Sequence, residues 1–66
     1  MFLKGRKYRH KSTLDVDVIV MTEPLENGDS VSFVASYYNR QYEFLMGLSE
    51  IVYVNKSAFA FWEEVC

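Results

Sequence analysis

An alternation of apolar and polar residues, which occurs twice, constrains the fold more than any other feature. In the first stretch the apolar side chains occupy every second position and Asp15 and Asp17 lie between them. Such a period of two, built largely from β-branched residues, is typical of a strand with one buried face. The apolar positions of the two stretches are Leu14, Val16, Val18 and Val20, then Val31, Phe33, Ala35 and Tyr37.

The turn between these two strands fixes how they pair. Asn27-Gly28 lies between them, and this dipeptide favours a two-residue hairpin turn because both residues tolerate positive φ. Such a turn predicts that Val20 lies opposite Ala35, so that the apolar phases of the two strands agree. Pro24, close to the end of the first strand, indicates an edge or a bulge there.

Two shorter apolar runs, "QYEFLM" at 41–46 and "IVYV" at 51–54, predict two further strands. A tight turn at Asn39-Arg40 would place Phe33 opposite Met46. After these strands, "NKSAFAFWEEV" predicts a short helical turn that begins at Asn55 or Ser57 and packs on the sheet.

The segment "KGRKYRHK" at 4–11 carries five of the seven basic side chains. Read as a strand joined to the next by a three-residue loop, it places Tyr8 and His10 on the buried face, with His10 opposite Leu14. On the outer face Arg9 then meets Asp15, and Lys7 meets Asp17. Because opposite charges stabilise cross-strand pairs, this register indicates that the sheet itself neutralises much of the basic segment.

The predicted architecture is a mainly β fold, a five-stranded antiparallel meander with a short C-terminal helical turn. It resembles the small SH3-like barrels, including Tudor, chromo-like and KOW-type domains, and "GRKYRHK" before an alternating strand is similar to the start of small bacterial and phage SH3-like proteins. The resemblance implies one SH3-like β-barrel domain over 1–66 that binds proteins, modified peptides or nucleic acid, since such domains are rarely enzymes. The glycine spacing of KOW motifs and the acidic loop of signalling SH3 domains are missing.

The residues needed for catalysis or for a cofactor are scarce. His10 is the single histidine and Cys66 the single cysteine, so a zinc site and a disulfide framework both lack ligands. Three scattered glycines form no phosphate-binding loop. We therefore expect no enzyme, no metal and no cofactor. With neither a signal peptide nor a membrane span in sight, we expect a cytoplasmic protein, in the host cytoplasm if a phage encodes it.

A second apolar row is predicted on the outer face of the sheet. The residues that the expected register brings together there are Ile19, Met21, Val34 and Leu45, with Tyr38 nearby. Either the segment with Phe59, Phe61 and Trp62 covers this row, or the row is an exposed contact surface. An exposed row predicts a protein partner or a homodimer, and it makes modulation of a protein complex by a small phage-type protein the leading hypothesis.

Two alternative functions remain at this point. A nucleic-acid-associated role would use the rim formed by Lys4, Arg6, Lys11 and Arg40. Binding through so few phosphate contacts would be weak and strongly dependent on salt. The third alternative is a small structural or assembly component that self-associates.

Overall fold

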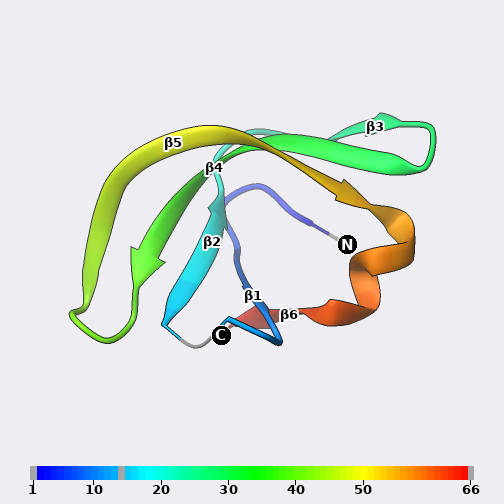
Figure 1. The fold of residues 1–66 in the computed structure, drawn as a ribbon. Helices are drawn as coiled ribbons and strands as arrows, with labels where there is room; N and C mark the ends of the chain where they lie inside the picture. Colours follow the sequence, from blue (N-terminus) through cyan, green and yellow to red (C-terminus); the bar gives the residue numbers. More distant parts are fainter. Residues whose placement is uncertain (1, 14, 66) are drawn as a thin grey trace.

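The computed structural model describes residues 2–13 and 15–65 and shows one antiparallel sheet with a short 3-10 helix (Figure 1). The protein is mainly β, as predicted, but its sheet has six strands instead of the predicted five. The helical turn is not the last element either, because a further strand, Trp62–Val65, follows it. The elements in chain order are β1 (Lys7–His10), β2 (Val16–Val20), β3 (Leu25–Asn27), β4 (Ser30–Asn39), β5 (Phe44–Asn55), the 3-10 helix η1 (Lys56–Phe61) and β6 (Trp62–Val65).

The central strand of the sheet is β4. One of its edges pairs with β2 and β3 in succession and the other pairs with β5, while β1 lies beside β2 and β6 lies beside β1. The sheet is strongly bent (Figure 1), but β3, β5 and β6 each pair with a single strand, and no pairing between β5 and β6 occurs among the described residues. The predicted closed barrel is therefore not formed, because the strands do not close on themselves and the sheet stays open.

The predicted pairing of β2 with β4 is confirmed, with Val20 opposite Ala35. The hairpin itself lies one residue later than expected, because Asn27 pairs with Ser30 and the loop is formed by Gly28 and Asp29. The chain accommodates this difference between β2 and β3, where Pro24 lacks the N–H that a continuous ladder requires. The predicted β2 strand thus becomes two strands along the same edge of β4.

The predicted pairing of β4 with the following strand is wrong. The two runs at 41–46 and 51–54 belong to one long strand, β5, and Phe33 lies opposite Val52 instead of Met46. The connection after Asn39 is also longer than a tight turn. The pairing of β5 with β4 is irregular between Ser36 and Tyr38, near Gly47, whose φ is +74°. β5 continues on both sides of this irregularity.

The predicted register of β1 is shifted by two residues, since Tyr8 lies opposite Val18 instead of Val16. A shift of two keeps every side chain on its expected face, so Tyr8 is buried as predicted. The connection to β2 is longer than three residues, and within it the N–H of Thr13 donates to the His10 carbonyl at 2.9 Å. The expected contact of His10 with Leu14 lies outside the described residues.

The core lies on the concave face of the sheet and centres on Phe2. Its ring packs edge-on against Tyr8, Phe59 and Trp62 with centroid distances of 4.8, 5.4 and 5.6 Å. The predicted helical turn is present as η1, with Asn55 at its N-cap position, but the Asn55 side chain makes no capping hydrogen bond. The buried apolar residues are Phe2, Tyr8, Val18, Val20, Val31, Phe33, Ala35 and Val54.

Candidate functional site

Three apolar side chains, one directly after β2, one on β4 and one on β5, form a row on the convex face of the sheet. The N–H of Met21 donates to the Val34 carbonyl at 2.8 Å, and Val34 lies opposite Ile51. Met21 is 48% exposed and Ile51 is 61% exposed. We call Met21, Val34 and Ile51 the outer row. Its third member is Ile51, not the predicted Leu45, because the register of β5 differs from the expected one.

The C-terminal segment does not cover the outer row. Phe59 and Trp62 pack against the core on the concave face, beside Phe2. Of the two alternatives left open by the sequence, the first does not occur: Phe59 and Trp62, which were expected as a possible cover, lie on the opposite side of the sheet from the outer row.

A shallow pocket of about 240 Å³ lies beside the outer row, between β3 and β5. Its size and its mainly apolar walls suit one inserted side chain better than a whole small-molecule ligand, which typically occupies at least about 300 Å³. One acidic residue, the exposed Glu23, is among the residues that line it. The lining residues are Thr22, Glu23, Leu25, Ser32, Phe33, Val34, Ile51 and Tyr53.

The other residues predicted for the apolar surface do not join the outer row. Ile19 is half-buried and lies opposite Ser36. Tyr38 lies opposite Leu45, and the Lys7 ammonium sits 4.8 Å from the centre of the Tyr38 ring. These residues therefore belong to a more polar part of the convex face.

A buried carboxylate organises that polar part. Asp17 is only 1% exposed, and its Oδ1 lies 3.2 Å from Nε of Arg9 and 2.9 Å from Nε of Arg40. Arg40 also donates from Nη2 to the Thr13 carbonyl at 3.4 Å. The sheet thus pairs basic residues with acids, as predicted, but the partners differ. Because the β1 register is shifted, Arg9 meets Asp17 instead of the expected Asp15, and Asp15 is exposed.

The four residues predicted for nucleic-acid binding do not form one surface. Arg6 pairs with Glu64 through Nη1 and Oε2 at 2.6 Å, and Arg40 is held at Asp17. Lys4 and Lys11 are exposed, and neither makes an ion pair within the described part of the chain. They lie in the turns beyond the two opposite ends of β1.

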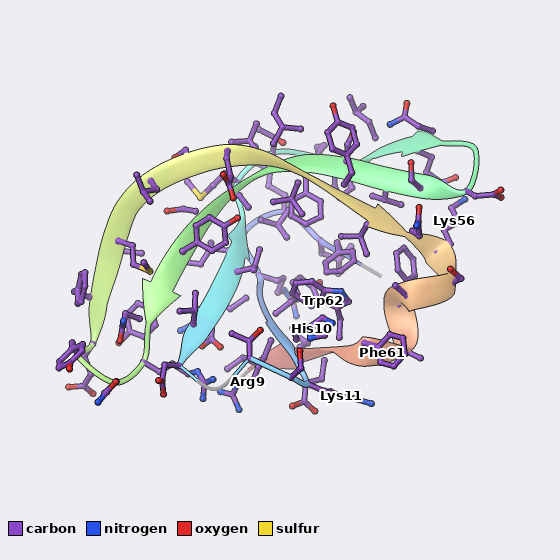
Figure 2. All side chains as sticks on the ribbon, viewed as in Figure 1. Arg9, His10, Lys11, Lys56, Phe61 and Trp62 are labelled. Atoms are coloured by element: carbon purple, nitrogen blue, oxygen red, sulfur yellow. The ribbon has the colours of Figure 1, made fainter. Side chains whose placement is uncertain are left out.

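A pair of stacked rings that the sequence reasoning missed lies at the end of β1. The rings of His10 and Phe61 are stacked with centroids 6.1 Å apart, and Trp62 meets His10 edge-on at 5.0 Å (Figure 2). The backbone N–H of Lys11 donates to the Phe61 carbonyl at 2.8 Å, so a basic residue follows the stacked rings in β1 and the Phe61 side chain is 56% exposed. The return of β6 to β1 creates this arrangement, and no local sequence signal indicates it.

The Tyr37 hydroxyl donates a hydrogen bond to the Glu50 carboxylate. Burial raises the pKa of Tyr37 to about 12, and its hydrogen bond to the Glu50 carboxylate and the negative charge of Glu50 act in the same direction. The pair lies across β4 and β5 near the open end of the sheet. The hydrogen bond holds the Glu50 side chain toward β4, and therefore away from the free edge of β5.

Within residues 2–13 and 15–65, no group of three or more His, Cys, Asp or Glu side chains is placed to hold a metal ion. The same residues include no helix that is long and apolar enough to cross a membrane. Cys66 lies outside the described residues.

The fold defines a small mainly β protein with a single antiparallel sheet and a 3-10 turn before its last strand. Comparisons with protein-family models, with curated proteins and with solved structures found no significant match.

Proposed function

We propose that this protein is a non-enzymatic interaction module that binds a protein partner through the outer row and the adjacent pocket. The observation that carries the proposal is the exposure of Met21 and Ile51 in one continuous row beside an apolar pocket. Exposed apolar surface of this kind marks contact sites in soluble proteins. An open SH3-like arrangement is part of the proposal, and the small antiparallel sheet with a helical turn before its last strand supports it.

The chemistry of the surface suggests what the partner presents. The pocket accepts one apolar side chain, and Glu23 at its margin favours a Lys or Arg next to that side chain. The net charge of −2 favours a basic partner surface in the same way. A small modulator of a larger complex, of the type found in phages and acting in the cytoplasm, would use such a site.

The test is a peptide-display selection against the wild-type protein. We expect peptides with an apolar residue flanked by Lys or Arg, and we expect Met21→Lys to weaken their binding at least tenfold because it places a charge in the outer row. Lys11→Glu is the matched control, because Lys11 is exposed at the other end of β1, where its N–H donates to the Phe61 carbonyl, and its charge change should leave binding unchanged. Selected peptides that bind folded Met21→Lys as tightly as wild type would rule out the outer row as the site.

A second candidate function is binding of single-stranded nucleic acid, and the stack of His10 and Phe61 beside Lys11 favours it. Exposed rings next to a cation offer a base a stacking surface. Fluorescence anisotropy with short DNA and RNA strands tests this function. Support would be micromolar binding that falls steeply with salt and is weakened by Phe61→Ala. No binding at low salt would eliminate the function.

A further inference from the structure

We infer that two copies of this chain pair antiparallel through the free edge of β5 and form one continuous sheet. Within the described chain β5 pairs with β4 alone, so its other edge has no neighbouring strand. At twelve residues it is the longest strand of the protein. An exposed edge strand presents unpaired N–H and C=O groups that can hydrogen-bond to another strand.

The direction of the backbone groups along β5 follows from the neighbouring pairings. Met21 donates its N–H to the Val34 carbonyl, so the backbone groups of Val34 point toward β2 and away from β5. In an antiparallel ladder the residue opposite, Ile51, then directs its own N–H and C=O away from β4. Because strand residues alternate, Ser49 and Tyr53 also direct theirs to the free edge.

The side chains of β5 give this edge little protection against pairing. Of its twelve residues only Glu50 is charged, and there is no proline or lysine, which are residues that natural proteins place on edges to prevent association. The opposite edge of the sheet differs, because β6 is short and carries Glu63 and Glu64. One edge of the sheet is thus guarded by charge and the other is largely apolar.

The occupant that best fits the free edge is a second copy in a two-fold arrangement. A register with Glu50 opposite Glu50 of the other copy is unfavourable because like charges would face each other. A register with Ile51 opposite its own copy instead places Glu50 opposite Val52 and Ser49 opposite Tyr53. It also joins the two outer rows into one apolar row across the dimer, and Tyr37 holds Glu50 away from the axis through its hydrogen bond.

This inference goes beyond the proposed function and is separable from it, because the dimer uses the backbone edge of β5 whereas the partner uses side chains of the convex face. Sedimentation velocity over a range from about 1 to 300 μM tests it directly. We expect a concentration-dependent shift from the 7.8 kDa chain to a species of twice that mass. A protein that remains monomeric at the highest concentration overturns the inference.

Ser49→Pro locates the contact. It removes an N–H that points to the free edge and leaves the hydrogen bonds to β4 in place, and proline is tolerated at such edge positions. We expect it to raise the dissociation constant of the dimer about 30-fold, since the symmetric dimer loses two backbone hydrogen bonds. Ser49→Ala, which keeps the N–H, is the matched control and should dimerise like wild type. A dimer that folded Ser49→Pro leaves unchanged would place the contact elsewhere and overturn the inference.

Amide hydrogen exchange on the wild-type protein gives a test that needs no variant. In the dimer the N–H groups of Ser49, Ile51 and Tyr53 are protected, and this protection disappears on dilution. The N–H groups of Glu50 and Val52, which face β4, stay protected at all concentrations. Rapid exchange of the first set at high concentration contradicts the inference even if Ser49→Pro fails to fold.

Discussion

At the scale of single residues, Asp17 is the most consequential polar group. It is a carboxylate on the convex face that is nevertheless buried, with Arg9 and Arg40 on either side of it. Since burial of a charge is unfavourable unless partners surround it, these two arginines make the position of Asp17 acceptable. Arg40 in turn connects the chain after β4 to the chain before β2.

We therefore predict that Asp17→Asn lowers the free energy of unfolding by about 2–4 kcal/mol, because it leaves two partly buried guanidinium groups without their counter-charge. Urea unfolding followed by circular dichroism measures the change. Asp15→Asn, an exposed carboxylate two residues earlier, should change stability by less than about 0.5 kcal/mol. Equal effects of the two substitutions would contradict the role given to Asp17.

Tyr37 predicts a pH dependence of stability. Its pKa in the folded protein is about 12, against 10.0 for an ordinary tyrosine, owing first to burial and then to Glu50. Above pH 10 the unfolded chain releases this proton while the folded protein keeps it, so folding stability falls as the pH rises from about 10 to 12. Below pH 10 the contribution is fully present and constant.

The measurement is urea unfolding at several pH values between 8 and 12 for wild type and Tyr37→Phe. Because lysines titrate in the same range, the informative quantity is the difference between the two proteins. We expect wild type to lose stability faster than Tyr37→Phe above pH 10. Parallel curves would show that Tyr37 titrates normally in the folded state.

At the scale of the elements, β5 depends on Gly47. Gly47 has a φ of +74°, which is readily adopted only by glycine. This conformation allows β5 to resume its pairing with β4 after the irregularity. Gly47→Ala should therefore lower the free energy of unfolding by about 1–2 kcal/mol. Ser49→Ala, two residues further along the same strand, should have little effect on unfolding of the folded chain. Thermal unfolding of both variants compares them, and equal midpoints would contradict the role of Gly47.

The elements also show why some pairings could be predicted from the sequence. Alternation with a period of two fixes which face of a strand is buried, but a shift by an even number of residues leaves the pattern intact. The β2–β4 pairing was predicted correctly although the turn lies one residue later than expected, because the chain between β2 and β3 takes up the difference. The β1–β2 pairing slipped by two residues, and the change from Leu45 to Ile51 in the outer row is likewise an even shift.

At the scale of the whole molecule, contacts between residues far apart in the sequence could not be predicted. Met21 and Val34 could be placed because β2 and β4 are joined by a short connection. The stack of His10 on Phe61 brings together residues about fifty positions apart, and it depends on the return of β6 to β1. Neither alternation nor turn chemistry carries information about such a contact.

The whole fold relies on Phe2, which contacts aromatic rings from β1, β4, η1 and β6. A domain of this size is only marginally stable. We predict that Phe2→Ala costs about 3–5 kcal/mol and leaves much of the protein unfolded at 37 °C. Near-ultraviolet circular dichroism would detect the loss of aromatic packing. Leu3→Ala is the matched control, since Leu3 is 54% exposed, and it should remain folded.

The position of Phe2 has a consequence for the order of events during synthesis. The ribosome makes Phe2 more than fifty residues before the rings that enclose it, Phe59 and Trp62. Because contacts so distant in the chain form slowly, the nascent protein must carry this central aromatic residue without its partner rings until translation has passed Trp62. A chain stalled before Trp62 would therefore lack the core contacts of Phe2 and would be recognised by the cell as unfolded.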